Sequence, residues 1–317
     1  MATAKTVDPV AGTPARPAAR VRRRGASAST RRAAWMFLAP FGVLFTLFYL
    51  LPIGYAVVKS FYKVERASLF SAPTEVFAGF DNYTQVFAND DFRASILRIL
   101  VFGIVQVPVM LALALLFALL LDSAVVTGKR FFRLAYFLPY GVPGVIAAIM
   151  WGFLYTPSLS PINDFTGWLG LDVNFLSGKL VLWSIANIVT WTYTGYNMLI
   201  IYSALQAIPT EVYEAARIDG ASGVAIALRI KIPIVRPALV LTAVFSIIGT
   251  LQLFTEPAVV RQIATVISST YTPTLAAYSQ VSAQNYGFGA AMSVVLAVAT
   301  FVLSFTFLKI TQRGADQ

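Results

Sequence analysis

The stretch Glu214–Pro237, EAARIDGASGVAIALRIKIPIVRP, is a polar island between two apolar segments of the chain. Only 12% of the 317 residues are charged and 58% are hydrophobic. Charged residues make up about a quarter of an average soluble domain. The composition therefore predicts an integral membrane protein. In such a protein, a polar island of this kind is a surface that a soluble partner can bind from the cytoplasm.

Six apolar segments are long enough to cross a membrane, because the hydrocarbon layer takes about 20 mostly apolar residues of helix. We predict an all-α membrane protein with six transmembrane helices, since helices satisfy their own backbone polar groups inside the bilayer. The transmembrane domain is predicted at 33–317. Its spans are expected at Trp35–Val58, Ser95–Leu121, Leu134–Tyr155, Leu180–Leu205, Ala238–Phe254 and Phe288–Leu308.

The basic residues predict the orientation of these spans. Seventeen of the 24 Lys and Arg residues fall in the N-terminal tail, the second and fourth loops and the C-terminal tail. Because the cytoplasmic side holds the excess of Lys and Arg, both termini and the polar island are predicted to be cytoplasmic. The net charge of +10 is then topological and indicates no nucleic-acid partner. Residues 1–32, rich in Ala, Arg, Pro and Ser, are predicted to form a disordered basic cytoplasmic tail.

The residue types that most enzymes and ion-coupled carriers need are scarce. The chain has no cysteine and no histidine, so thiolate chemistry and the commonest general base and metal ligand are missing. Within the predicted spans the only ionised side chain is Arg98. We expect no catalytic residue and no metal site. A proton-coupled carrier normally has an intramembrane carboxylate or histidine relay, and the spans contain none.

The polar island is predicted to contain two short helices. Thr210 is a candidate N-cap of the first helix, and Gly220 is well placed to end it. Asp219 is expected to brace the turn at Gly220 through side-chain hydrogen bonds to the backbone. Ser222 is a candidate N-cap of a second helix that runs to about Lys231. The prolines of the island, Pro233 and Pro237, are then expected to bound the turn into the fifth span.

The island resembles the EAA loop of ABC importer permeases. The resemblance rests on Glu214-Ala215-Ala216, on Asp219-Gly220-Ala221, and on the spacing to Ile230, Pro233 and Pro237. The flanking run Leu205–Tyr213, and Phe137–Pro139 with Val142–Val145, resemble the maltose-type, binding-protein-dependent carbohydrate permeases. The chain departs from the family at Val224, where a larger residue is usual, and at Ala227, where an aromatic is common. These departures imply that the loop packs differently or less tightly on its partner.

The resemblance implies a coupling loop at 208–237 that docks on a separate ATPase. Its ATPase-coupling residues would be Glu214, Ala215, Ala216, Asp219, Gly220, Ala221, Ile230 and Pro233. The sequence agrees that another subunit hydrolyses ATP, because no stretch of this chain matches the phosphate-binding loop Gly-x-x-x-x-Gly-Lys-Ser/Thr. The chain is therefore expected to be no enzyme and to carry no cofactor, with ATP and Mg bound by the partner ATPase. The implied partners are a second permease subunit, an ATPase dimer and an extracytoplasmic sugar-binding protein, in a bacterial inner membrane and its lipid.

The fourth predicted span is unusually polar and aromatic, and such surroundings suit sugars, whose hydroxyls pair with amides and phenols while the ring faces stack on aromatic rings. Matching the fourth and fifth spans to the maltose-type pattern implies a substrate path at Thr192, Tyr193, Tyr196, Ser246, Gly249 and Gln252. The alternative is that such residues only pack helices together. In the third span, the run of prolines and glycines from Pro139 to Gly144 predicts a kink that is either part of a gate or a static bend.

Three functions remain open at this point. The resemblance implies ATP-driven sugar import by alternating access. An amino-acid or peptide permease also carries the loop, but the aromatic, uncharged fourth span holds no buried ion to meet a zwitterion. An ion-coupled secondary transporter would not explain the loop. The external segment 59–94 is expected to meet the binding protein and the partner permease, and in permeases of this kind the segment 255–287 reaches toward the binding protein.

Overall fold

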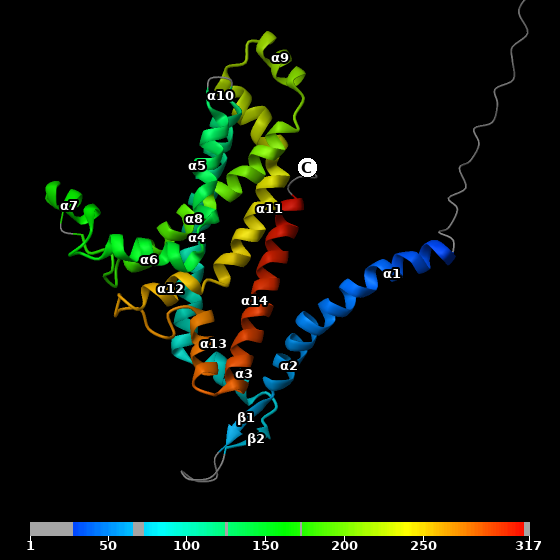
Figure 1. Ribbon diagram of the computed structural model, residues 1–317, viewed down its shortest axis with the longest axis vertical. Helices are drawn as coiled ribbons and strands as arrows, with labels where there is room; N and C mark the ends of the chain where they lie inside the picture. The colour runs from blue at the N-terminus through cyan, green and yellow to red at the C-terminus, as the bar shows by residue number, and fades with distance from the viewer. Residues whose placement is uncertain (1–27, 66–72, 124–125, 172, 314–317) are drawn as a thin grey trace, which may run out of the picture. The chain divides into compact units, whose positions relative to one another are not determined.

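The apolar segments of the chain form long helices (Figure 1), and a computed structural model describes residues 28–65, 73–123, 126–171 and 173–313. The chain divides into two compact units, Met1–Ile53 and Gly54–Gln317. The first unit contains α1 (Ala28–Phe45), the π-helical turn η1 (Thr46–Leu50) and the start of α2 (Leu51–Lys59). Its large apolar side chains from Trp35 to Ile53 are exposed. This helix therefore needs lipid or another protein around it.

The disordered tail predicted at 1–32 lies mostly outside the described residues. Residues 1–27 are not described, and α1 begins at Ala28. The order of the tail therefore stays a prediction.

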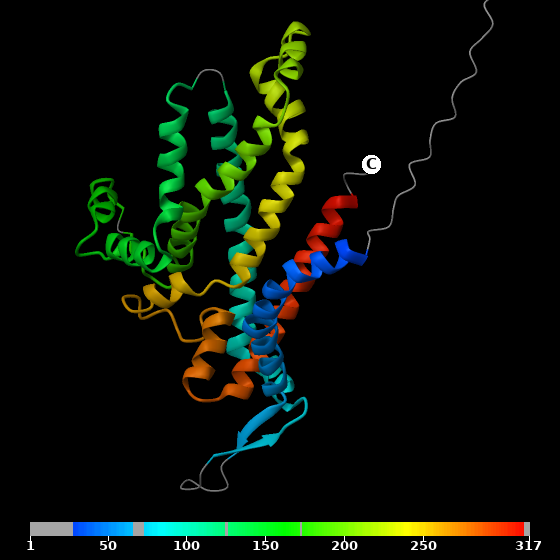
Figure 2. The ribbon, with the colours of Figure 1, turned by 45° about the vertical axis from the view of Figure 1, so that its right-hand side comes forward.

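Four long helices carry the second unit: α4 (Asp90–Asp122), α8 (Val181–Gln206), α11 (Ile232–Leu251) and α14 (Tyr286–Arg313). Helix α8 packs against α4 and α11, and α11 also packs against α4 and α14 (Figures 1 and 2). The interfaces hold fully buried apolar side chains such as Phe102, Ile188 and Met198. Many apolar side chains on the outer sides of these helices are exposed. A lipid environment accounts for both observations, because lipid tails are as apolar as the side chains they meet.

The third predicted span is two helices rather than one. Helices α5 (Lys129–Gly141) and α6 (Gly144–Tyr155) are separated by a bend of 95°. Pro143 has no backbone N–H to donate and holds the preceding Val142 in an extended conformation, at φ −80° and ψ 124°. The predicted kink is present, but it is large enough to make Leu134–Tyr155 a broken span or a re-entrant loop.

Helix α5 lies very close to α8. A Cβ atom at Gly195 of α8 would stand 1.7 Å from the carbonyl oxygen of Tyr136, so only glycine permits this crossing. The contact sets the position of the α5 end and, with it, the side chains that α5 presents to the rest of the unit.

The fifth predicted span, Ala238–Phe254, belongs to a longer helix. Helix α10 (Gly223–Ile226), the π-helical turn η2 (Ala227–Lys231) and α11 follow one another without a break. The turn expected at Pro233 and Pro237 was wrong. Pro233 stands in the first turn of α11. Because η2 continues directly into α11, both prolines are interior to one helix, and neighbouring helices let membrane helices tolerate interior prolines.

Four helices of the described chain are apolar and long enough to cross a membrane, or five if the bent pair counts as one span. They are Trp35–Lys59, Asp90–Asp122, Gly223–Val260 and Tyr286–Thr311, with α5 and α6 as the pair. Helix α8 matches the fourth prediction in place and has 26 residues, about 39 Å at the usual rise. Helix α8 is not among the candidate spans named above, because its polar stretch lowers its mean hydropathy. The described helices therefore supply four or five candidate membrane spans.

One end of the second unit carries a feature that the all-α prediction missed. Strands β1 (Tyr62–Glu65) and β2 (Thr74–Phe77) pair as an antiparallel hairpin, with Tyr62 opposite Phe77. The side chain of Asn82, in α3 (Asp81–Ala88), donates to the carbonyl oxygens of Ser60 and Tyr62 at 2.8 Å each. The segment is only four residues per strand, too short for its alternation to stand out in the sequence.

The remaining helices are short and lie in the loops. They are α7 (Pro161–Trp168), α9 (Thr210–Ile218), α12 (Thr255–Val260) and α13 (Pro273–Ser282). In both views, α9 lies at one end of the second unit, while α3, α13 and the hairpin lie at the opposite end (Figures 1 and 2). The polar island and the loops expected outside are thus at opposite ends of the long helices.

Candidate coupling surface and solute pocket

Helix α9 ends in a backbone arrangement that depends on Gly220. The N–H of Ala221 donates to the carbonyl of Ala216 at 2.9 Å, and the N–H of Gly220 donates to that of Arg217 at 3.0 Å. This is the Schellman pattern, in which the residue after the helix adopts a left-handed conformation. Gly220 has φ +81°. The predicted helix end at Gly220 is therefore confirmed.

Two other details of the predicted loop differ. Pro209 rather than Thr210 occupies the N-cap position of α9, because Pro209 is extended (ψ 139°) and Thr210 is already helical. Among the described interactions, the side chain of Asp219 makes no hydrogen bond, since backbone groups alone close the turn. The cap predicted at Ser222 is confirmed: its hydroxyl accepts from the N–H of Ala225 at 3.2 Å.

The tip of the loop presents apolar side chains to the surroundings. Ile218 is 87% exposed and Val224 is 69% exposed. Glu214 and Ala215 are exposed beside them, whereas Ala216 and Ala221 are half-buried. Ile230 and Pro233 lie farther along, on η2 and α11. An acidic residue among exposed apolar and small side chains is a surface that fits a protein partner.

A buried polar cluster anchors the loop to the bundle. Lys231 of η2 forms an ion pair with Asp122 at the end of α4, and the side-chain amide of Gln206 donates to the other Asp122 oxygen at 2.7 Å. The Lys231 ammonium also lies 4.8 Å from the ring centre of Tyr213 in α9. The side chains of Asp122 and Lys231 are only 6% and 13% exposed. The cluster therefore joins four segments: α4, α8, α9 and η2.

Tyr213 is the member of this cluster that α9 contributes. Burial, followed by the nearby charge of Asp122, raises the pKa of the Tyr213 phenol. Its hydroxyl is buried without a hydrogen-bond partner among the described residues. The sequence analysis missed Asp122 as a site residue, although a carboxylate at the end of an apolar span, on the side with excess Lys and Arg, was a usable signal.

A polar pocket of about 310 Å³ lies between α8 and α11. Five of the six residues predicted for the substrate path line it, namely Tyr193, Tyr196, Ser246, Gly249 and Gln252. The sixth, Thr192, does not. It is 4% exposed, and its hydroxyl donates to the carbonyl of Ile188 at 2.9 Å within its own helix. Thr192 is therefore a packing residue in this structure.

Other segments also contribute side chains to the pocket. Tyr140, near the end of α5, stacks on Tyr196 with ring centres 4.6 Å apart, and meets Tyr193 edge-on at 5.9 Å. Gln106 of α4 and Glu256 of α12 also line the pocket. The run from Pro139 to Gly144 was the signal for Tyr140, since a broken helix presents its ends inward. Glu256 stands two residues beyond the predicted end of the fifth span.

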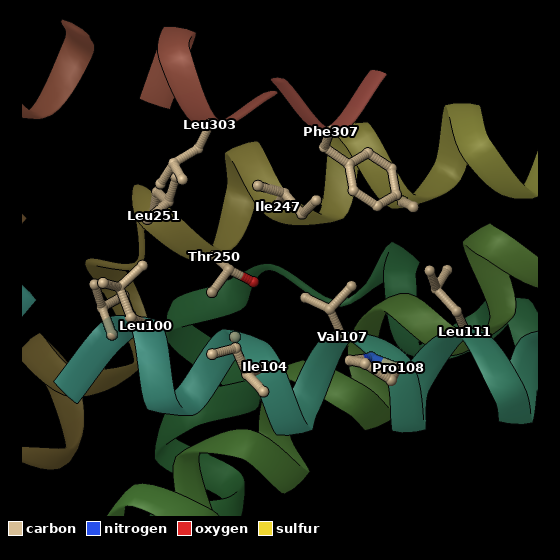
Figure 3. Close-up of a pocket in the computed structure, with 13 residues that line it drawn as sticks. Leu100, Ile104, Val107, Pro108, Leu111, Ile247, Thr250, Leu251, Leu303 and Phe307 are labelled. Atoms are coloured by element: carbon tan, nitrogen blue, oxygen red, sulfur yellow. The ribbon is translucent and has the colours of Figure 1, made fainter. Parts of the chain in front are cut away.

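A second, larger hollow of about 590 Å³ is almost entirely apolar (Figure 3). Side chains of α4, α11 and α14 line it, and Thr250 is the polar residue among them. It offers a sugar almost no hydrogen bonds and suits lipid tails or another helix. Among the described residues, no group of three or more His, Cys, Asp or Glu side chains is arranged to hold a metal ion.

Comparison with known proteins identifies the fold and the family. The family model described as "Binding-protein-dependent transport system inner membrane component" matches residues 87–313. The chain is 31% identical over 291 residues to the arabinooligosaccharide transport system permease protein AraP of Halalkalibacterium halodurans, with 89% of each chain covered. It is 33% identical over 229 residues to the lactose transport system permease protein LacF of Rhizobium radiobacter, covering 70% of this chain and 74% of that one.

A solved structure shares the fold. It is the crystal structure of a bacterial ABC transporter involved in the import of the acidic polysaccharide alginate, with a TM-score of 0.77 at 20% identity. The match covers 90% of this chain and 96% of that chain. The protein is an integral, multi-pass protein of the inner membrane. With a family match over most of its length, the chain belongs to the binding-protein-dependent transport system inner membrane components, the permease subunits of ABC importers, in which a separate subunit hydrolyses ATP.

Proposed function

We propose that this chain is a transmembrane permease subunit of an ATP-driven, binding-protein-dependent sugar importer. The observation that carries the proposal is the pocket between α8 and α11, where three tyrosine rings face amide and hydroxyl groups. Stacking on a sugar ring and hydrogen bonding to its hydroxyls require both kinds of group. The names of the related permeases, which import arabinooligosaccharides and lactose, support the same class of solute.

The proposal includes six transmembrane spans with both termini in the cytoplasm. Helix α8 supplies the span that apolarity alone leaves out, because Tyr193, Tyr196 and Asn197 line the pocket and other polar residues, such as Thr192, are buried. The broken pair α5 and α6 supplies another. The excess of Lys and Arg on the side of the termini and of the loop at 208–237 supports the orientation.

The coupling loop is proposed to dock on the ATPase through α9. The exposed residues Glu214, Ala215 and Ile218 supply the contact, and Gly220 sets the direction in which the chain leaves the helix. Two further proteins complete the assembly: a second permease subunit and an extracytoplasmic sugar-binding protein. An alginate ABC transporter of the same fold has been solved with its periplasmic protein bound, which supports such an assembly.

A continuous helical path links the loop with the pocket. The chain is helical from Gly223 to Leu251, so a movement of Lys231 reaches Gly249 through 18 residues, about 27 Å of helix. At the loop end, the pair between Lys231 and Asp122 carries the same movement to α4. Closure of the ATPases would thus rock the helices on both sides of the pocket, which is alternating access.

A permease for amino acids or peptides is the competing function. Glu256 gives this alternative an observation in its favour, because a buried carboxylate can meet an ammonium group. A zwitterion also carries a carboxylate, and none of the described pocket-lining residues is Lys or Arg. The pocket therefore favours a sugar.

The test is uptake into proteoliposomes that contain the purified importer and its binding protein. Labelled sugars should be taken up with ATP, and labelled amino acids should not. Glu214→Ala removes an exposed side chain, and Gly220→Ala places a Cβ at φ +81° at a cost of about 1–2 kcal/mol. Both variants should keep hydrolysing ATP while uptake per ATP falls. Normal uptake by both would overturn the coupling assignment, and uptake of amino acids alone would overturn the sugar assignment.

A further inference from the structure

Glu256 is a buried carboxylate that no part of the proposed mechanism uses so far. It is only 6% exposed, and its side chain lines the pocket between α8 and α11. Among the described hydrogen bonds and ion pairs, none joins its carboxylate to another side chain. A buried carboxylate without a cation or a side-chain donor is costly unless something else stabilises it.

The backbone N–H of Glu256 itself stabilises the carboxylate, and the start of α6 lies beside it. A Cβ placed on Gly144, the first residue of α6, would lie 3.8 Å from the Glu256 carboxylate oxygen. The carboxylate is thus close to the N-terminal end of a 12-residue helix, where free N–H groups and the helix dipole favour an anion. The carboxylate has no cationic partner among the described residues that line the pocket, and it faces whatever enters there.

A second acceptor of the pocket is the side chain of Gln106. The side-chain oxygen of Gln106 is buried without a hydrogen-bond partner among the described residues. Its amide nitrogen is held by Thr190 at 3.3 Å. The pocket thus offers two strong acceptor groups, Glu256 and Gln106, in addition to the phenol and amide groups. Buried acceptors of this kind normally find a donor, and the solute is the donor that remains.

The charge of the residues that line the pocket also favours a solute without a negative charge. Glu256 is the only charged side chain among the described residues that line the pocket. A solute that carries a carboxylate, sulfonate or phosphate would bring a second negative charge into the same desolvated space. A neutral sugar instead brings hydroxyl donors for Glu256 and Gln106, and an amino sugar brings a cation.

We infer that Glu256 sets the charge preference of this permease, so that neutral and amino sugars pass and acidic sugars are rejected. The inference rests on the proposed function and narrows it to a class of substrate.

The test compares three ligands that differ in one charge: methyl glucoside, methyl glucosaminide and methyl glucuronide. Their dissociation constants are measured at pH 6.5 by saturation-transfer NMR on the purified importer without its binding protein, so that only the membrane subunits select. The wild-type importer should bind the glucuronide about tenfold more weakly than the glucoside, a difference of about 1.4 kcal/mol. The glucosaminide should bind at least as tightly as the glucoside.

The variant Glu256→Gln keeps the size of the side chain and removes its charge. It should bring the glucuronide to within about twofold of the glucoside and weaken the glucosaminide. The control Asp164→Asn removes an exposed charge from α7 and should leave all three ratios unchanged. If Glu256→Gln does not assemble, the wild-type ratios still decide.

The outcomes separate the inference from the proposed function. A wild-type importer that binds all three sugars equally, or a Glu256→Gln variant with wild-type ratios, overturns the charge preference but leaves sugar import standing. Absence of binding to any of the three sugars would count against the proposed function itself.

Discussion

Asp122 is the residue whose loss should most clearly separate stability from coupling. Its carboxylate forms an ion pair with Lys231 of the coupling loop and accepts a hydrogen bond from the side-chain amide of Gln206 in α8. Both members of the ion pair are nearly buried. Asp122→Asn keeps the shape but leaves the Lys231 ammonium without its counter-charge. Removing one partner of a buried pair costs about 3–5 kcal/mol. Because Lys231 is 13% exposed and water can reach it, we expect the lower end, about 3 kcal/mol.

The assay is thermal unfolding of the purified importer together with uptake per ATP hydrolysed. At about 2–4 °C for each kcal/mol, Asp122→Asn should lower the unfolding temperature by roughly 6–12 °C. Uptake per ATP should fall as well, since the loop loses its attachment to α4. The double variant Asp122→Asn with Lys231→Met also removes the unpaired Lys231 ammonium. It should recover most of the stability but not the coupling.

The matched control lies at the opposite end of the same helix. Asp90 and Arg93 form an exposed ion pair in α4, with side chains 88% and 62% exposed. Exposed pairs contribute at most about 1 kcal/mol, so Asp90→Asn should change the unfolding temperature by a few degrees at most. Equal effects of Asp122→Asn and Asp90→Asn would refute the reasoning, because they would mean that the Asp122 cluster is not a buried anchor.

Two further predictions concern close packing. Gly195→Ala should prevent assembly, because its Cβ would stand 1.7 Å from the carbonyl oxygen of Tyr136, whereas the control Gly167→Ala meets open space and should assemble normally. The yield of complex is measured by size-exclusion chromatography. A normal yield for Gly195→Ala would contradict the close crossing of α5 and α8. Arg98→Leu should release the external loop, because the guanidinium donates to the carbonyl of Tyr271 at 2.7 Å and lies 4.4 Å from the centre of its ring. Limited proteolysis should then cut the segment 261–285 several-fold faster, and an unchanged cleavage rate would count against this anchor.

Local signals in the sequence predicted the parts of the site that depend on backbone chemistry. Gly220 ends α9 because glycine readily adopts a left-handed conformation, and Ser222 caps the next helix because its hydroxyl reaches a free N–H. Tyr196 and Gln252 were expected in a polar environment because bulky polar groups in a membrane need one, and both line the pocket.

The parts that failed depend on how distant segments meet. Asp122 and Lys231 are 109 positions apart, and nothing local to either residue indicates that they pair. Tyr140 enters the pocket because α5 packs closely on α8 at Gly195, and nothing local to Tyr140 indicates that crossing. Glu256 belongs to a short helix beyond the predicted span, so its burial follows from packing against α6 rather than from its own neighbours.

At two prolines and one threonine, a local sequence rule gave a wrong prediction because the surrounding structure overrides it. Pro233 and Pro237 usually bound a helix, yet the chain stays helical through both because a π-helical turn precedes them and other helices surround α11. Thr192 belongs to a polar stretch, yet its hydroxyl bonds to the backbone one turn earlier.

The central claim is that the loop at 208–237 meets the ATPase, and site-specific crosslinking tests it most directly. The chain contains no cysteine, so Ile218→Cys introduces one thiol at an exposed position of the loop. In native membranes, a short thiol-to-amine crosslinker should join this thiol to an ATPase subunit. The exposed Leu169, after α7 and outside the loop, provides the control Leu169→Cys, which should give no such product. Absence of an ATPase adduct at Ile218→Cys, in an importer that still transports, would contradict the account.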